Sequence, residues 1–279
     1  MNRIGFMQGR LVNQINGKIQ AFPWQEWQLE FPRAAAIGLT MIEWTLDDQD
    51  LEKNPLLTAI GQAEIRRLSA LHNVSIPSIT GDCFMQAPFW KCDESVRAKL
   101  LQKLDLVLEA ASTLNISYVV IPLVDNGCIE NAQQKKCLLD NLLARLEFLT
   151  HHKLQVVFET DYPPEEYREF LQDFPSTAFN VNYDIGNSAS LGFDPAAEFA
   201  SYGKRIVNVH VKDRLLGGTT VPLGTGAADF DKVFAGLANL GYSRNYILQT
   251  ARASDGEHST ALSRYAAMTK QLLDRHHGS

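Results

Sequence analysis

Four side chains that can bind a metal ion each lie at the end of a short β-rich segment in the second half of the chain. They are Glu159, Asp184, His210 and Gln249. Carboxylate, imidazole and amide ligands suit Mn, Mg, Zn or Co better than a metal that prefers thiolates. The sequence therefore predicts a divalent metal site where these segments end. Taken singly, the histidine also fits a hydrogen-bonded core residue and the aspartate a turn.

The segments that carry these residues alternate apolar and polar side chains. Residues two apart in a strand point to the same side. In the segment 206–212, three valines share one face: Val207, Val209 and Val211. Its polar residues share the other: Asn208, His210 and Lys212. A polar face inside a protein is costly unless it is satisfied or used. We therefore expect the polar faces to line a barrel and the apolar faces to pack against helices.

Eight strands and eight helices are expected to alternate along the chain. The strands are expected at 3–7, 40–45, 74–78, 118–122, 155–159, 179–184, 206–212 and 246–250. The helices are expected at 24–37, 61–72, 95–114, 132–150, 164–173, 195–202, 231–240 and 260–275. One strand–helix unit takes about 35 residues, which is typical of an α/β (β/α)8 TIM barrel. We expect residues 1–279 to form a single such domain, and a doubly wound open sheet is the structural rival.

Composition narrows the function. The 279 residues include 26 basic and 32 acidic side chains, a net charge of -6, which argues against a nucleic-acid partner. No apolar run is long enough to span a membrane, and the first residues lack a signal-peptide core. None of the four cysteines has C-x-x-C spacing, so reduced thiols and a cytoplasmic location are expected.

Several short motifs, in a fixed order, match a known family. They are Ile42-Glu43-Trp44, Val157-Phe158-Glu159, Asn182-Tyr183-Asp184-Ile185-Gly186-Asn187, Val209-His210-Val211-Lys212-Asp213 and Pro222-Leu223-Gly224-Thr225-Gly226. This ordered set resembles the xylose isomerase-like TIM-barrel superfamily of sugar isomerases, sugar-phosphate epimerases and endonuclease IV-type enzymes. The resemblance covers essentially the whole barrel.

The resemblance implies roles for the four candidate ligands. Glu159, Asp184 and His210 match the first three metal ligands of the family, and the fourth ligand is normally a glutamate. Gln249 stands there instead. Its amide oxygen can bind a metal, but it cannot accept a proton. Related epimerases use two carboxylates, one on each face of the sugar carbon, and often have a histidine where this chain has Asn187.

These features predict a metal-dependent sugar or sugar-phosphate isomerase or epimerase that abstracts a proton beside a carbonyl through an enediolate-type intermediate. Glu159 is the expected proton shuttle, and Gln249 occupies the second catalytic position. Asp82 and Glu43 are reserve acids. The simpler interpretation of Glu43 is a buried ion-pair partner, and that of Asp82 is a turn residue.

Basic residues near the expected barrel mouth are candidates for binding the substrate. Lys212, Arg214 and Arg252 follow the last two strands, where barrels often bind phosphate. Together with nearby glycine N–H groups they would hold a sugar phosphate or a sugar acid, unless they are solvated surface charges. Other residues expected to bind substrate or line the mouth are Gln8, Arg10, Glu43, Trp44, Asp82 and Asn187. The apolar residues Phe84, Met85, Phe89 and Trp90 are expected to form a lid or a homo-oligomer contact.

Other functions fit parts of the pattern. A sugar lyase or dehydratase begins with the same proton abstraction, and the fold does not separate it from an isomerase. Gln249 also fits a barrel that binds a sugar but has lost catalysis. A DNA-repair endonuclease would need more histidine ligands and a basic groove, which an acidic chain with 7 histidines does not favour.

Overall fold

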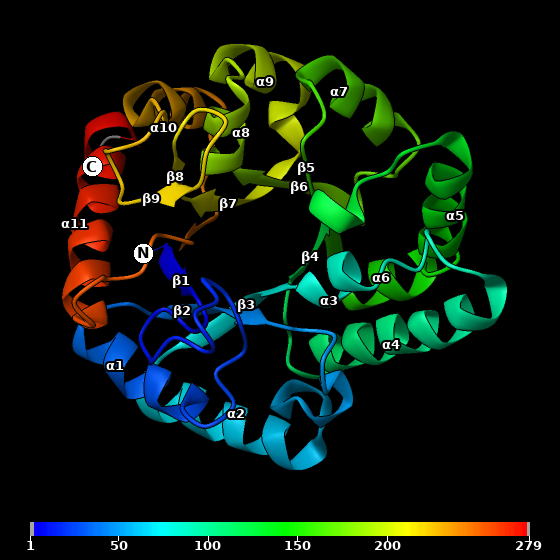
Figure 1. Cartoon of the computed structure of the whole chain (residues 1–279), viewed down its shortest axis with the longest axis horizontal. Helices are drawn as coiled ribbons and strands as arrows, with labels where there is room; N and C mark the ends of the chain where they lie inside the picture. The colour runs from blue at the N-terminus through cyan, green and yellow to red at the C-terminus, as the bar shows by residue number, and fades with distance from the viewer. Residues whose placement is uncertain (1–2, 278–279) are drawn as a thin grey trace.

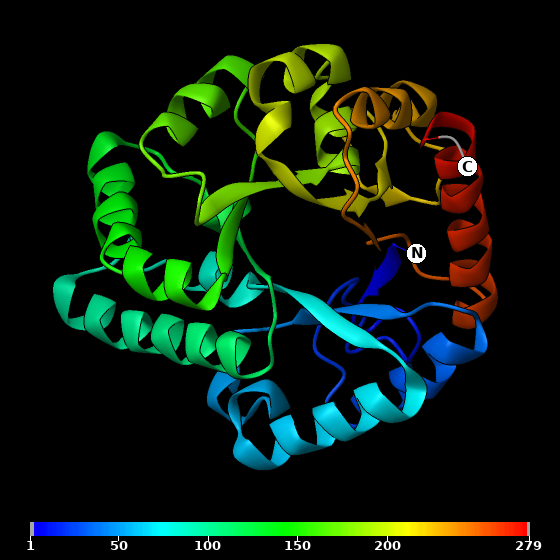
Figure 2. The same ribbon diagram turned by 180° about the vertical axis from the view of Figure 1, so that it is seen from behind.

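The strands form one closed barrel. This computed structural model describes residues 3–277, in which eight parallel strands follow the order β1-β10-β7-β6-β5-β4-β3-β2. The first strand pairs with both β2 and β10, which closes the ring. Helices surround the strands on the outside (Figures 1 and 2). The closure confirms the predicted TIM barrel over the open sheet.

The barrel strands lie close to their predicted positions. They are β1 Ile4–Met7, β2 Met41–Thr45, β3 Ser75–Thr80, β4 Tyr118–Leu123, β5 Gln155–Thr160, β6 Phe179–Asp184, β7 Ile206–Val211 and β10 Asn245–Leu248. Two further strands were not predicted. They are β8 Asp213–Arg214 and β9 Thr220–Val221, an antiparallel pair after β7.

The helices that surround the barrel follow the predicted apolar stripes. They are α1 Glu30–Ala36, α2 Ala59–His72, α4 Glu94–Thr113, α5 Ala132–Leu143, α6 Leu146–His152, α7 Pro164–Gln172, α9 Pro195–Tyr202, α10 Phe230–Asn239 and α11 His258–His277. Two short helices, α3 Asp82–Gln86 and α8 Ile185–Leu191, follow β3 and β6 directly. No helix within residues 3–277 is long and apolar enough to cross a bilayer.

The single helix predicted over 132–150 is in fact two. Arg145 lies between α5 and α6, where its guanidinium binds both carboxylate oxygens of Asp105 at 2.5 and 2.9 Å. The same side chain donates to the Asn141 carbonyl at 2.7 Å. These contacts hold the bend against α4, and apolar spacing alone carries no signal of them.

The strand faces divide the core into two parts. Val209 and Val211 belong to the large cluster between the strands and the helices, as expected. A small cluster inside the barrel consists of Tyr118, Val120, Val157 and Val207. The prediction that Val207 faces the helices is wrong. The pairing of β6 with β7 shifts register by one residue at this point, which turns Val207 into the lumen.

The aromatic segment after β3 is part of the core. Phe84, Phe89 and Trp90 are buried, and the Trp90 indole donates to the Gly127 carbonyl at 3.2 Å. This segment is therefore neither the lid nor the subunit contact that was expected, because its aromatic side chains pack inside the protein. Trp44 also packs in the core and not at the mouth, with its indole donating to Asn54 Oδ1 at 3.0 Å.

Candidate metal centre at the barrel mouth

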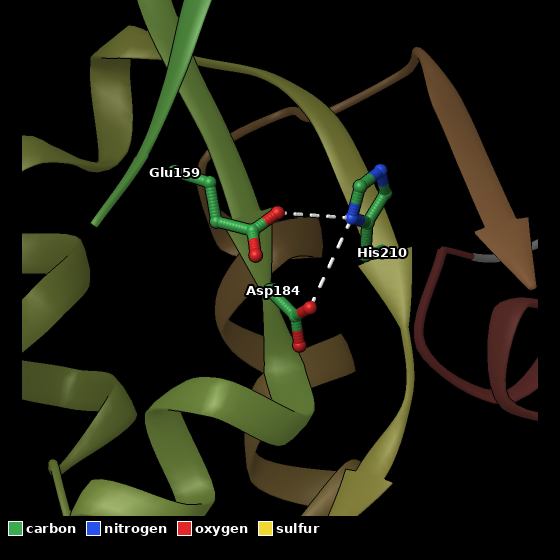
Figure 3. Close-up of side chains that lie close together, drawn as sticks. All are labelled: Glu159, Asp184 and His210. Carbon is green, nitrogen blue, oxygen red and sulfur yellow. Dashed lines mark ion pairs between the residues drawn. The ribbon is translucent and has the colours of Figure 1, made fainter. Parts of the chain in front are cut away.

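Three buried side chains meet at the carboxyl ends of neighbouring strands. Glu159 is the next-to-last residue of β5, Asp184 ends β6 and His210 is the next-to-last residue of β7 (Figure 3). One ligand atom from each lies within 4.8 Å of the others. His210 Nδ1 is 3.1 Å from Glu159 Oε2 and 3.9 Å from Asp184 Oδ2. The structure thus brings together three of the four predicted ligands.

The other ring nitrogen of His210 is fixed by Glu43. His210 Nε2 lies 2.6 Å from Glu43 Oε1, and both residues are fully buried. The second oxygen of Glu43 accepts from Ser78 Oγ at 2.6 Å and from Asn208 Nδ2 at 2.8 Å. Burial disfavours both charges, but their mutual attraction outweighs it, so the pKa of Glu43 is lowered and that of His210 is raised well above its ordinary value. Glu43 therefore lies behind the histidine, as in the ion-pair alternative, and fixes its orientation.

Two asparagines hold the Glu159 carboxylate. Asn187 Nδ2 donates to Oε1 at 2.7 Å, and Asn182 Nδ2 donates to Oε2 at 2.8 Å. The same Asn182 nitrogen lies 3.0 Å from His210 Nδ1, and its oxygen accepts from Asn208. The polar strand faces predicted to line the barrel are thus one connected network.

Asp184 is fixed from two directions. Its Oδ1 accepts the backbone N–H of Asn187 and so caps α8, and its Oδ2 accepts from Lys212 Nζ at 3.1 Å. Burial raises the pKa of Asp184, but the Lys212 charge and the contact with His210 lower it well below the usual range. The carboxylate therefore stays ionised.

Gln249 follows the last residue of β10, the strand that pairs with the strand of His210. Ile247 pairs with His210 in the β10–β7 register, and the Gln249 N–H donates to the Val211 carbonyl at 3.1 Å. Its side-chain nitrogen donates to Gln20 Oε1 at 3.0 Å, whereas its own Oε1 is buried and accepts no hydrogen bond from the described residues. A carbonyl oxygen in that state is suited to a cation.

The donor set fits a divalent metal ion. Two carboxylates gathered within 4.8 Å repel each other unless a positive charge lies between them. A histidine whose far nitrogen faces a carboxylate is the usual arrangement of a metal ligand. The Oε1 of Gln249 supplies a further unused oxygen. Oxygen and imidazole donors together fit Mn, Mg, Zn or Co.

Asp82 begins α3 at the same end of the barrel. Its Oδ2 accepts from Gln20 Nε2 at 2.6 Å, and its Oδ1 accepts from Thr80 Oγ1 at 3.1 Å. Burial raises its pKa to about 6, and the charges of Asp47 and Glu159 add to the rise. Gln20, which bridges Asp82 to Gln249, was not predicted because it lies in an irregular segment with no periodic pattern.

The predicted cations fall into two groups. Lys212 and Arg214 meet at Asn187, whose Oδ1 accepts from them at 3.0 and 2.9 Å. Arg252 points elsewhere, with its two terminal nitrogens donating to the carbonyls of Gly9 and Val12. Arg252 thus ties the loop after β1 to the end of β10.

Gln8 and Arg10 are tied into the same end of the barrel. The Arg10 side chain donates to the carbonyls of Thr250 at 2.9 Å and Ile19 at 2.7 Å. Gln8 is fully buried, and its Oε1 accepts the Thr45 N–H at 3.0 Å. Gln8, Arg10 and Arg252, which were expected to line the mouth, therefore bind backbone groups of the surrounding loops and strands.

Comparison with known proteins agrees with the barrel fold. A family model described as xylose isomerase-like TIM barrel matches residues 31–271. The L-ribulose-5-phosphate 3-epimerase UlaE of Shigella flexneri serotype 5b (strain 8401) is 26% identical over 246 residues, which cover 82% of this chain and 84% of that protein. Two solved structures share the fold. The IOLI protein with a binding zinc atom has a TM-score of 0.75 at 16% identity, covering 99% of this chain and 100% of that one. D-psicose 3-epimerase in the presence of D-fructose has a TM-score of 0.74 at 12% identity, with the same coverage.

Proposed function

Since the chain belongs to the xylose isomerase-like TIM barrel family, we propose that it is a metal-dependent sugar isomerase or epimerase. The similar proteins named as epimerases bear out the prediction of an enzyme of the isomerase and epimerase class. The observation that carries the metal-dependent reaction is the buried cluster of Glu159, Asp184 and His210.

In this proposal Glu159, Asp184 and His210 Nδ1 hold the ion, with the Gln249 amide oxygen as a fourth ligand. A bound divalent cation stabilises negative charge on the oxygens of a sugar, which makes the C–H bond beside a carbonyl more acidic. Glu43 keeps the histidine ring turned toward the two carboxylates, because it holds the opposite nitrogen at 2.6 Å.

Glu159 is the proposed proton shuttle. Its two oxygens are fixed by the amides of Asn182 and Asn187, so its position is set before substrate arrives. A positioned carboxylate can take the proton from the carbon and return it to a neighbouring atom. The Asn187 amide contacts Glu159, and the Lys212 ammonium contacts Asn187. We propose that these two groups orient sugar hydroxyl groups.

Epimerisation also needs a proton on the opposite face of the carbon. Gln249 cannot supply one by acid–base exchange. Asp82 is the proposed second group, because a pKa of about 6 lets it take up and release a proton near neutral pH. Its link through Gln20 to Gln249 connects it with the position where a carboxylate was expected.

The test is exchange of a sugar C–H hydrogen with solvent deuterium, followed by NMR with and without a chelator. The wild type with added Mn, Mg, Zn or Co should exchange one carbon-bound hydrogen of a ketose, and Glu159→Gln should lose at least about 100-fold in rate. Glu166→Gln, an exposed change on α7, serves as the control.

Exchange that is unaffected by chelator or by Glu159→Gln would contradict the proposed mechanism. Sugar binding without exchange would instead support a barrel that has lost catalysis, the alternative that Gln249 favours. Loss of water or cleavage of the sugar would identify a dehydratase or lyase.

A further inference from the structure

Two of the four cysteine thiols donate to the same backbone oxygen. Cys92 Sγ lies 3.4 Å from the Phe89 carbonyl oxygen, and Cys137 Sγ lies 3.8 Å from it. The first thiol belongs to the loop between α3 and α4, and the second belongs to α5. Because both sulfurs contact one atom, the distance between them is no greater than the sum of these two contacts. The fold therefore brings together two free thiols from separate segments.

A small molecule can reach both thiols. Cys92 and Cys137 are each half-buried, and both line a hollow of about 420 Å³ between the loop and α5. The ammonium groups of Lys91 and Lys136 and the guanidinium of Arg97 belong to residues that line the same hollow. Partly exposed thiols in surroundings that contain cations are the ones that oxidants reach and modify.

Hydrogen bonds fix the backbone that carries the two thiols. Arg97 Nε donates to the Phe89 carbonyl at 3.2 Å, and its Nη2 donates to the Cys92 carbonyl at 2.8 Å. On α5, Asn141 Nδ2 donates to the Cys137 carbonyl at 2.8 Å and lies 3.7 Å from the Cys137 sulfur. Both thiols are therefore held at one place before any oxidant arrives.

The other two cysteines have different surroundings. Cys83 is buried in the core, and burial raises the pKa of its thiol well above the ordinary value. Cys128 Sγ lies 3.5 Å from Lys91 Nζ and 3.9 Å from Glu130 Oε1, so an ion pair surrounds it. Cys83 and Cys128 thus serve as internal comparisons for the pair.

We propose that Cys92 and Cys137 form a disulfide when the folded protein meets a hydroperoxide, and that small thiols reverse it. In the first step one thiolate attacks a peroxide oxygen, which gives a sulfenic acid while the other oxygen leaves as water. In the second step the partner thiol attacks the sulfenic sulfur, the S–S bond forms and a second water leaves. The two thiols lose two electrons and two protons, and the peroxide takes up both. The modification does not depend on the reaction proposed at the barrel mouth.

The surroundings of Cys137 set the order of the two steps. Burial raises the pKa of the Cys137 thiol, which the charge of Arg97 opposes and the neighbouring Cys92 increases. The thiolate is the form that attacks a peroxide, so a thiol that keeps its proton reacts slowly. We therefore assign the first step to Cys92 and the second to Cys137.

Peptide mapping tests the bond directly, because tryptic cleavage after Lys and Arg places each cysteine in a different peptide. Cys92 falls in 92–97 and Cys137 in 137–145. The folded protein is treated with hydrogen peroxide, its remaining thiols are alkylated, and the digest is analysed by mass spectrometry with and without dithiothreitol. The linked pair 92–97 and 137–145 should exceed every other pairing by at least about 10-fold, since oxidation is selective for accessible neighbouring thiols. The link should disappear after reduction.

Serine variants provide the controls. Cys128→Ser should keep the link, whereas Cys92→Ser and Cys137→Ser should each lose it. In Cys137→Ser the first step has no partner, so Cys92 should accumulate as a sulfenic acid that dimedone traps. Trapping at Cys137 in Cys92→Ser, without trapping at Cys92 in Cys137→Ser, would overturn the assigned order. If a variant does not fold, the map of the wild type decides the question alone.

Three results for the wild type would overturn the proposal. They are a dominant link to Cys83 or Cys128, irreversible oxidation of Cys92 in place of a link, and thiols that stay reduced in the peroxide. The melting temperature gives a second readout, because the bond constrains the unfolded chain. Oxidation should raise Tm by about 5 °C in the wild type and not in Cys137→Ser. A linked wild type whose Tm falls would mean that the fold does not hold the two thiols together.

Discussion

A metal-binding histidine is oriented by the group that holds its second nitrogen. Glu43 holds the second nitrogen of His210, the proposed metal ligand, at 2.6 Å, and both side chains are fully buried. We expect Glu43→Gln to weaken Zn²⁺ or Mn²⁺ binding by about 10- to 100-fold, measured by calorimetry, because the carboxylate charge behind the ring is lost. Glu169→Gln, which changes an exposed glutamate on α7, should leave the affinity unchanged. Equal affinities in the two variants would mean that Glu43 does not act through the histidine.

The amide at position 249 removes a proton acceptor from the proposed site. Gln249→Glu should raise the rate of solvent deuterium exchange into a ketose by about 100-fold, because it adds a carboxylate to Glu159 and Asp82, the two groups proposed to move protons. It should also tighten metal binding by adding a charged ligand. Gln249→Ala provides the comparison, since it removes the amide without adding a base. A Gln249→Glu protein no faster than the alanine variant would argue against a catalytic position there.

Asp82 predicts a particular pH dependence of stability. Burial raises its pKa from 3.8 to about 6, so the folded protein holds this proton more tightly than the unfolded chain does. As pH rises through this range, the wild type should lose about 3 kcal/mol of stability relative to Asp82→Asn, and the difference should level off above pH 6. Urea unfolding of both proteins between about pH 4 and about pH 7 measures this. If the stabilities of the wild type and Asp82→Asn change with pH in parallel, the pKa of Asp82 is not raised in the folded protein.

The candidate ligands could be predicted because period-2 alternation gives each strand a polar face with a defined end. Glu159, Asp184 and His210 follow from that rule. Glu43 had two interpretations, and only the contact with His210 separates them. Gln20 lies in an irregular segment, so nothing in the sequence indicates that it bridges Asp82 and Gln249.

At the scale of elements, a buried acid fixes the helix that Asp184 begins. Glu198 on α9 accepts from the hydroxyls of Tyr183 at 2.8 Å and Tyr202 at 2.6 Å, and from Ser188 on α8. Glu198→Ala should lower the free energy of unfolding by about 3 kcal/mol, because buried hydroxyls lose their acceptor. Urea denaturation measures it, with the exposed Glu169→Ala as control. A loss as small as in the control would show that Glu198 does not fix these elements.

The strands and helices of the eight strand–helix units could be predicted, and the extra short elements between them could not. Strands and helices of the barrel have a periodic apolar face. The short helices α3 and α8 instead depend on local contacts, such as the Asp184 carboxylate accepting the Asn187 N–H at 2.9 Å. The bend between α5 and α6 depends on Arg145 reaching Asp105, a residue 40 positions away. Contacts of this kind exist only after the chain has folded.

At the scale of the whole molecule, closure of the barrel makes the site. Glu43 and His210 are 167 positions apart, and they meet because β2 and β7 line the same lumen. The number and spacing of the strand–helix units indicated the closed barrel. The sequence did not indicate which polar residues meet across the interior or which cations bind backbone carbonyls. Both depend on the register between strands and on loops that have no periodic pattern.

The position of a bound metal tests the proposed centre most directly. Crystals grown with Zn²⁺ or Mn²⁺ should show an anomalous scattering peak about 2.0–2.3 Å from oxygens of Glu159 and Asp184, His210 Nδ1 and the Gln249 amide oxygen. The peak should be lost in His210→Ala crystals. A wild-type protein that binds no ion there, or binds one only at another place, would contradict the assignment of this cluster as the metal centre.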